Sequence, residues 1–183
     1  MNNIMSLFHC NEDTTINMII SDIDQINLLK SFGDKFWLGT GIYFWDNLGN
    51  AKYWKNDKER KNSDKKYSIV KVRVCLDNVL NLTDPDVGKQ FKNIINKISE
   101  IDPIIQKGGF GEKIDFLSRK FPEIMGNYEV IIADGYYAKQ TNKIFKNMRS
   151  YLPRLTDKNK RIYNVIKNDA IVEVLEKEVD LNE

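Results

Sequence analysis

Apolar residues recur along this chain at two spacings, and the two spacings predict a mixture of strands and helices. In residues 67–76, valines alternate with charged or polar residues, which is the period of a strand that keeps one face in water. In residues 12–29, isoleucines occur at 16, 19, 20 and 23, which is the spacing of a helix with one buried face. Both patterns are present, so neither an all-helical nor an all-strand fold is expected.

The same patterns place the remaining elements. Strands are predicted at residues 6–10, 41–45, 67–76, 128–135, 160–166 and 170–176. Helices are predicted at residues 12–29, 47–55, 87–101 and 111–121, with Pro85 suited to the first turn of the third. The turn-like triplet 167–169 predicts that the last two strands form a hairpin. No repeat, linker or low-complexity block is seen, so residues 1–183 are predicted to form one α+β domain.

Composition limits the class of protein. Of the 183 residues, 42% are hydrophobic and 30% are charged, which is typical of a globular protein able to bury its own core. The N-terminal residues lack the pattern of a secretory leader, and no stretch approaches the roughly 20 apolar residues of a membrane span, so a cytoplasmic location is expected. Two distant cysteines, Cys10 and Cys75, and a single histidine predict neither a disulfide framework nor a metal site.

The basic residues are concentrated in two segments, although the net charge is only +2. Residues 52–73 hold nine Lys and Arg against three acidic residues, and residues 139–161 hold eight against one. Such segments are either solvated faces or surfaces that meet nucleic acid. The sequence leaves both interpretations open.

Residues 38–54 contain an unusual density of aromatic side chains, including Tyr43 and Trp54. Such a cluster is either part of the core or the lining of a site for a flat ligand. Gly39 and Gly41 favour the second interpretation, because glycines allow a ligand or another backbone to approach closely.

The order of these parts resembles a known family. A strand ending in His9 is followed by a helix, then by "LGTGIYFW" at residues 38–45, then by another helix. This order resembles the ADP-ribosyltransferases that use a histidine and a tyrosine in the NAD pocket, whose motifs read like "HGT" and "GKGIYF". Here the first motif reads "HCN" at residues 9–11. The resemblance implies an α+β fold built on a split pair of small, mostly antiparallel sheets with flanking helices.

The resemblance also implies site residues. His9 would orient the nicotinamide ribose, and Tyr43 would stack on the nicotinamide, with Trp54, eleven residues later, covering its other side. The remaining NAD-binding positions implied by the family motifs are Cys10, Asn11 and Gly41. Cys10 stands where the family has a glycine.

The third signature position of the family falls on Tyr163, or on Asn164 if the alignment slips by one residue. Neither is acidic, which resembles members that transfer a single ADP-ribose. Glu12 and Glu173 are carboxylates that could substitute if the fold brings them to the site.

The resemblance therefore implies a mono-ADP-ribosyltransferase that uses NAD as co-substrate and no metal. The layout is similar to that of small bacterial toxins and phage-defence proteins, so a macromolecular acceptor and a neutralising antitoxin are expected partners, with nucleic acid favoured over protein. Breaking the bond between nicotinamide and ribose mainly requires that the reacting groups be held in place. Three alternatives stay open: an NAD glycohydrolase, an inactive nucleic-acid-binding module on the same fold, and an aromatic stretch that is only core.

Overall fold

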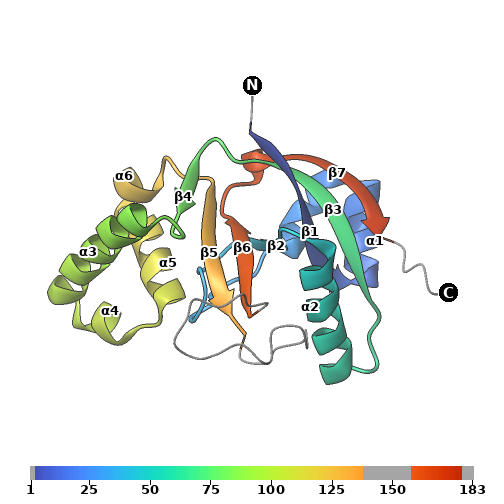
Figure 1. The fold of residues 1–183 in the computed structure, drawn as a ribbon, viewed down its shortest axis with the longest axis horizontal. Helices are drawn as coiled ribbons and strands as arrows, with labels where there is room; N and C mark the ends of the chain where they lie inside the picture. Colours follow the sequence, from blue (N-terminus) through green and yellow to red (C-terminus); the bar gives the residue numbers. More distant parts are fainter. Residues whose placement is uncertain (1–2, 138–157, 179–183) are drawn as a thin grey trace, which may run out of the picture.

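The structure, a computed structural model, describes residues 3–137 and 158–178. A seven-stranded sheet crosses the molecule in the order β4-β5-β6-β2-β1-β3-β7 (Figure 1). In that order the strands are β4 (Val79–Asn81), β5 (Val130–Tyr136), β6 (Asn159–Val165), β2 (Ile42–Trp45), β1 (Ile4–Glu12), β3 (Tyr67–Cys75) and β7 (Ile171–Glu178). Only the β4–β5 pair is parallel, and the other pairs are antiparallel. The α+β prediction is confirmed for these residues.

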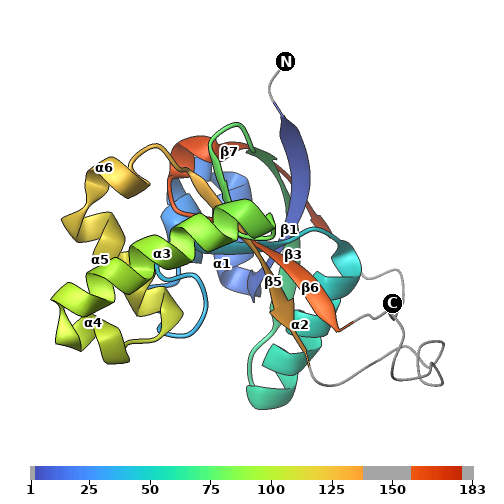
Figure 2. The ribbon, with the colours of Figure 1, turned by 60° about the vertical axis from the view of Figure 1, so that its left-hand side comes forward.

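Helices lie on both sides of this sheet. They are α1 (Asp13–Ser21), the 3-10 helix η1 (Ile23–Leu29), α2 (Leu48–Lys61), α3 (Pro85–Ile101), α4 (Pro103–Lys107), α5 (Phe110–Lys120), α6 (Pro122–Met125) and the 3-10 helix η3 (Asn168–Ala170). Figures 1 and 2 show α3 to α6 grouped beside the β4–β5 edge, with α1 and α2 near β1 and β3. None of the helices in the described part of the chain is long and apolar enough to cross a membrane.

The sheet separates two hydrophobic clusters, because successive side chains of a strand point to opposite faces. One cluster contains Trp45 and Ala51 together with residues of α3 and α5. The other contains Leu7 and Phe44 together with residues of α1 and η1. Each strand near the centre of the sheet therefore contributes to both clusters.

The two central strands, β1 and β2, share the register pair Phe8–Trp45, whereas β1 pairs with β3 along its whole length. One register pair therefore joins the β4-β5-β6-β2 part of the sheet to the β1-β3-β7 part. Their short junction in the middle is where a gap can open between β1 and β2.

Two sequence predictions about connections are wrong. Residues 12–29 do not form one helix, because Asp22 has an extended backbone and its side chain accepts a hydrogen bond from the backbone N–H of Asp24, which ends α1 and starts η1. β6 and β7 do not form a hairpin, because β6 already has β2 and β5 at its two edges. The chain therefore passes through η3 and pairs β7 with β3.

Gly41 is required by packing rather than by a ligand. It exchanges two backbone hydrogen bonds with Ser31, of 2.8 and 3.0 Å. A Cβ at this position would lie 2.0 Å from Oδ1 of the fully buried Asn164 and 2.8 Å from the carbonyl oxygen of Val165. The absent side chain makes room for β6.

We expect Gly41→Ala to lower the free energy of unfolding by about 2 kcal/mol, because the buried Asn164 and the Val165 backbone must move to accept the methyl group. Gly49→Ala is the matched control, since Gly49 is exposed near the start of α2 and has no close contact for a Cβ. The control should leave the free energy of unfolding unchanged or raise it by less than about 1 kcal/mol. Urea denaturation measures both, and equal stabilities for the two variants would contradict this account.

Candidate functional site

A cavity of about 250 Å³ opens where β1 and β2 part. His9, Cys10 and Asn11 of β1 and Tyr43 and Trp45 of β2 contribute to its lining. Among the residues that the structure describes, six aromatic side chains line its walls, namely those of Trp37, Tyr43, Trp45, Trp54, Tyr67 and Tyr137. This lining suits a flat ring system.

His9 is held in one orientation and one tautomer. Its side chain is 7% exposed, and Nδ1 lies 2.7 Å from the carbonyl oxygen of Tyr43. Because a carbonyl only accepts, Nδ1 carries the proton and Nε2 presents a lone pair. Burial lowers the pKa of His9 from 6.5 to about 4, so the ring is neutral at pH 7. His9 therefore offers the cavity a hydrogen-bond acceptor.

Buried polar atoms without partners gather around this cavity. Among the described residues they are Nε2 of His9, the hydroxyl of Tyr137 and Oδ1 of Asn164. His9 and Tyr137 line the cavity, and Asn164 lies opposite Tyr43 in the register of β2 and β6. Native structures leave few such atoms unsatisfied, so Nε2 of His9 and the Tyr137 hydroxyl are two groups at this cavity with hydrogen-bonding capacity to spare.

Tyr43 and Trp54, the two nicotinamide-binding residues implied by the sequence, both line the cavity. The Tyr43 hydroxyl donates to the carbonyl of Gly39 at 2.7 Å and accepts from the backbone N–H of Leu38 at 3.0 Å. Burial raises the pKa of that hydroxyl, so it stays protonated. Trp54 packs against Trp45, with ring centroids 6.1 Å apart. Trp45 belongs to both the core and the cavity.

Cys10 and Asn11 also line the cavity. Cys10 is buried, and burial raises the pKa of its thiol to about 12, so the thiol is neutral. The side-chain oxygen of Asn11 accepts from the backbone N–H of Glu12 at 2.8 Å. Gly41 does not contribute to the lining.

Tyr163 faces away from the cavity. It is buried in the cluster that contains Leu7 and Phe44, on the other side of the sheet. Ile162 lines the cavity, and Asn164 shares its face of β6, donating from Nδ2 to the carbonyl of Leu38 at 3.0 Å. The alternative register that places Asn164 at the third signature position is thus the one that points toward Tyr43.

Neither Glu12 nor Glu173 reaches the cavity. Glu12 pairs with Lys65 at 2.6 Å, and Glu173 pairs with Arg73 at 3.3 Å on the edge strand β7. Asp34, which the sequence analysis missed, supplies the one carboxylate among the described residues that line the cavity. Its Oδ1 accepts from the backbone N–H groups of Phe36 and Trp37, both at 3.0 Å. Asp commonly forms a turn by accepting hydrogen bonds from the backbone N–H groups two and three residues later. An Asp in the loop before β2 was therefore the signal in the sequence.

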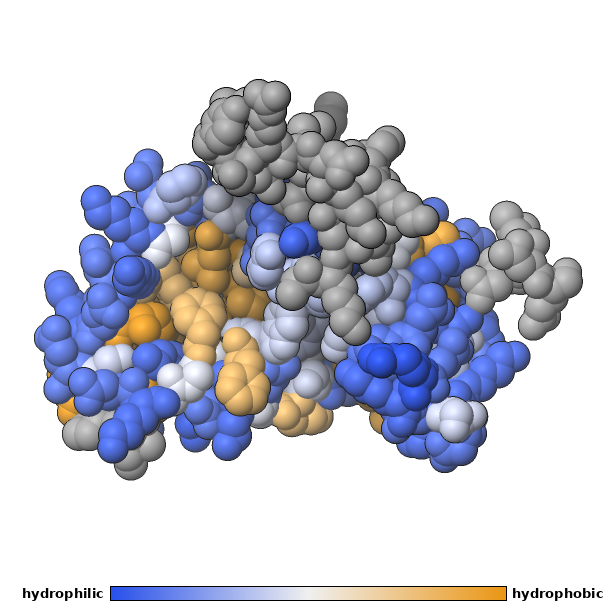
Figure 3. Space-filling view, turned by 60° about the horizontal axis from the view of Figure 1, so that its bottom comes forward, coloured by the Kyte–Doolittle hydropathy of each residue, from blue (hydrophilic) through white to orange (hydrophobic). Residues whose placement is uncertain are grey.

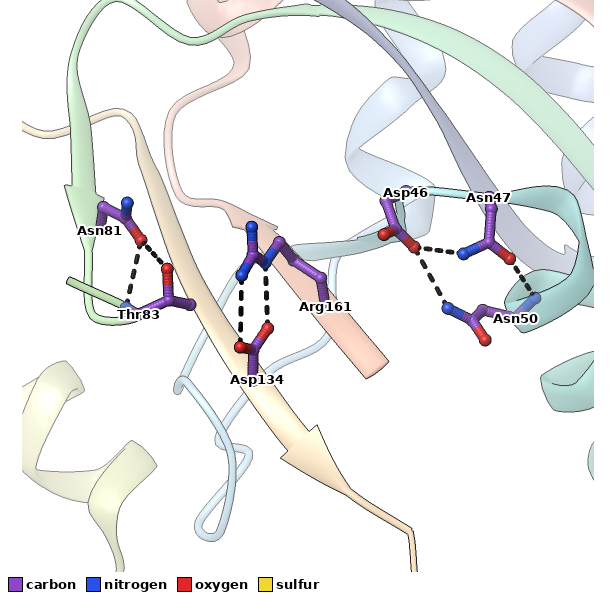
Figure 4. Close-up of polar contacts among 7 residues, drawn as sticks. All are labelled: Asp46, Asn47, Asn50, Asn81, Thr83, Asp134 and Arg161. Atoms are coloured by element: carbon purple, nitrogen blue, oxygen red, sulfur yellow. Dashed lines mark hydrogen bonds and ion pairs between the residues drawn. The ribbon is translucent and has the colours of Figure 1, made fainter. Parts of the chain in front are cut away.

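Lys160 is a buried cation on the cavity face of β6. Its ammonium donates to Oδ1 of Asn50 at 2.8 Å and lies 5.0 Å from the centroid of the Tyr53 ring and 5.7 Å from that of Tyr137. Asn50 is itself held by Asp46 at 3.1 Å (Figure 4). This network fixes the start of α2 against β6, beside the Tyr137 wall of the cavity.

The basic segment at residues 52–73 is largely paired with carboxylates. Arg60 and Lys61 each lie 2.6 Å from Asp57, while Lys65 and Arg73 have the partners given above. Lys58 instead lines the cavity, with its ammonium 5.5 Å from the Trp54 ring centroid. With the Lys55–Glu59 pair at 3.9 Å, five of the nine cations of this segment have a carboxylate partner.

Most of the basic segment 139–161 lies outside the described residues. Of its described cations, Lys160 is buried as above. Arg161 forms a two-point pair with Asp134, at 3.0 and 3.3 Å (Figure 4).

Comparison with protein-family models, with curated proteins and with solved structures gives no match. Within residues 3–137 and 158–178, no group of three or more His, Cys, Asp and Glu side chains is arranged to hold a metal ion. The function is therefore argued from the cavity itself.

The His9 assignment predicts an unusual titration. His9 is the only histidine of the chain, so the ring-proton NMR signals report it alone. We expect no titration between pH 8 and pH 5 in the folded protein, because the pKa lies near 4. A midpoint close to 6.5 would show that His9 is solvated and would remove the neutral acceptor from the site.

The same shift has a thermodynamic consequence. The unfolded chain binds a proton below pH 6.5 and the folded chain only below about 4, so stability is lost as pH falls through this window, by roughly 3 kcal/mol in total. His9→Asn is the control, since it keeps an N–H for the Tyr43 carbonyl but does not titrate. Asp13, whose pKa is lowered to about 2 by Lys177 and Ser68, titrates alike in both proteins.

Proposed function

We propose that this protein is an NAD-dependent mono-ADP-ribosyltransferase acting on a macromolecule. One observation carries the proposal: a neutral, oriented His9 acceptor lies in the same cavity as Tyr43 and Trp54, on the elements where the family motifs place them. The sequence resemblance and the cavity support the same assignment. The split-sheet architecture of that family is part of this proposal.

The proposed roles follow from the chemistry of each side chain. Nε2 of His9 accepts a hydrogen bond from a ribose hydroxyl, and the aromatic rings of the cavity hold the flat nicotinamide. The ammonium groups of Lys58 and Lys30, which line the same cavity, suit the negatively charged pyrophosphate of NAD. Holding the nicotinamide and the pyrophosphate in this way leaves the bond between nicotinamide and ribose accessible to a nucleophile.

The transfer breaks the bond between C1′ of the ribose and the nicotinamide nitrogen, and its electron pair leaves with the nicotinamide. Positive charge develops on the ribose until the acceptor nucleophile bonds to C1′ and gives up its proton. A fixed carboxylate nearby stabilises that charge without reorganising. Asp34 is placed for this role, because its own backbone hydrogen bonds fix it at the cavity wall.

Water could replace the acceptor in the same cavity, which would make the protein an NAD glycohydrolase. A module that binds without catalysis is the other alternative, and it is motivated by Cys10 in place of the family glycine and by the non-acidic Tyr163 and Asn164. NAD labelled on its adenylate, incubated with and without cell lysate, separates the three. Label on macromolecules supports transfer, free ADP-ribose alone supports hydrolysis, and unchanged NAD supports the binding module.

We expect Tyr43→Ala to abolish nicotinamide release, because the ring wall is lost and the ribose is no longer held in place. Tyr43→Phe keeps the ring and removes only the hydroxyl that ties residues 38 and 39, so it should retain at least about a tenth of the wild-type rate. Nicotinamide release from NAD measures both, with circular dichroism confirming the fold. Full activity in folded Tyr43→Ala would exclude the proposed nicotinamide site.

Asp34→Asn separates the charge of this side chain from its structural role. The amide oxygen can still accept from Phe36 and Trp37, so the loop and the melting temperature should be preserved. The rate should fall by about 100-fold while the KM for NAD changes little, because the lost charge acts in the transition state. A proportionate rise in KM at unchanged kcat would instead assign Asp34 to ground-state binding. Asp34→Ala should additionally destabilise the protein.

A further inference from the structure

The loop between η1 and β2 exposes two phenylalanines. Phe32 is 76% exposed and Phe36 is 83% exposed, although large aromatic side chains are normally buried. The same loop carries Lys30, Asp34 and Trp37, which line the proposed NAD cavity. Figure 3, in which this side of the molecule comes forward, shows apolar side chains at the surface between hydrophilic margins.

The exposure does not come from an unanchored loop. Ser31 forms the two backbone hydrogen bonds with Gly41, and the N–H of Gly33 donates to the hydroxyl of Thr40 at 3.2 Å. Further along, the carbonyl of Lys35 accepts from the N–H of Gly111 at 3.0 Å. The loop backbone is thus tied to residues 40–41, just before β2, and to α5, so the backbone at both phenylalanines is anchored.

A second cavity, of about 570 Å³, lies behind the Gly39–Gly41 turn. Three basic side chains line it, those of Lys30, Arg119 and Lys167. Against these three cations stands one carboxylate among the described lining residues, Asp115, whose two oxygens accept from the N–H of Thr40 at 2.7 Å and from the Thr40 hydroxyl at 3.1 Å. The cavity therefore suits an anion.

The two cavities are adjacent, because Lys30 lines both of them. Phe32 lies two residues along the chain from Lys30, in the stretch that is bonded to Thr40 and Gly41. Phe36 lines, with Trp37 and Phe110, a further hollow of about 480 Å³. Lys30 and the exposed rings of Phe32 and Phe36 therefore follow one another along one short path of chain, residues 30–37, beside the proposed NAD cavity.

We propose that this path binds single-stranded nucleic acid. Bases stack on Phe32 and Phe36, and backbone phosphates lie against Lys30 and Arg119, which is the combination by which proteins hold single strands. The identity of the acceptor rests on the transferase activity proposed above. If that activity is present, the strand bound here is the acceptor, and one of its nucleotides reaches the ribose of NAD beside Lys30.

A single strand fits this surface better than a duplex. Both rings are exposed at the surface, so they stack on bases whose faces are free, whereas paired bases in a duplex already stack on one another. The basic segment at residues 52–73 is a weaker candidate, because five of its nine cations are paired with carboxylates.

Binding is measured by fluorescence anisotropy without NAD, using fluorescein-labelled 12-mers of single-stranded DNA and RNA and the matching duplexes. We expect at least one of the single strands to bind at least tenfold more tightly than its duplex. The double variant Phe32→Ala/Phe36→Ala should weaken single-strand binding by roughly 10- to 100-fold, since one stacking platform is lost at each ring. Phe32→Trp/Phe36→Trp should restore binding, because it keeps an aromatic face.

Two further variants separate stacking from charge. Arg119→Gln should weaken binding and reduce the slope of log K against log salt by about 0.7, as expected for one lost phosphate contact on a single strand. Ile101→Ala is the matched control, because Ile101 is 80% exposed at the end of α3, away from the path, and its loss should leave binding unchanged.

The outcomes distinguish this inference from the proposed function. Wild-type protein that releases nicotinamide from NAD but binds none of the single strands, or binds duplex more tightly, overturns the nucleic-acid path and leaves the NAD site standing. Single-strand binding that survives the double alanine substitution also overturns it. Ring-dependent binding by a protein that never consumes NAD supports the path and overturns the transferase.

Discussion

The hydrogen bond from Nδ1 of His9 to the carbonyl of Tyr43 holds the centre of this structure together. It forms beside the one register pair that joins β1 to β2, so a side chain continues the contact where the backbone ladder stops. The same bond fixes the imidazole tautomer and leaves Nε2 without a partner. The geometry of the cavity and its chemistry therefore depend on a single contact.

That arrangement leaves Nε2 of His9 without a protein hydrogen-bond donor. A buried acceptor without a hydrogen bond costs about 1–3 kcal/mol, and the Tyr137 hydroxyl beside the same cavity adds a second unsatisfied group. Nε2 of His9 does not take up a proton at neutral pH, because burial holds the pKa of the ring near 4. A ligand hydroxyl that reaches Nε2 removes the cost, so part of the binding free energy is stored in the fold.

The sequence predicted the elements well where one strong pattern governed them, and poorly where distant parts of the chain compete. The alternation in residues 67–76 and the helical spacing in 87–101 correspond closely to β3 and α3. The hairpin between β6 and β7 failed because strand partners are decided by the whole sheet, not by the turn. Gly41 was assigned to a ligand approach because no local signal shows that Asn164, 123 residues away in sequence, occupies the adjacent space.

The residues of the candidate site also fall into two groups: those that a local sequence motif identifies and those that only the packing of the chain reveals. His9, Tyr43 and Trp54 could be found because they stand at fixed spacings within two short motifs, and the structure brings all three to one cavity. Asp34 and Tyr137 carried no such motif and could be found only from the packing of the chain. Tyr163 was misplaced because a shift of one residue along a strand exchanges the two faces of the sheet.

Net charge gave little guidance, because the effect of each cation depends on whether the fold brings a carboxylate next to it. Folding pairs much of the 52–73 segment with carboxylates, whereas Lys30 lies between two cavities.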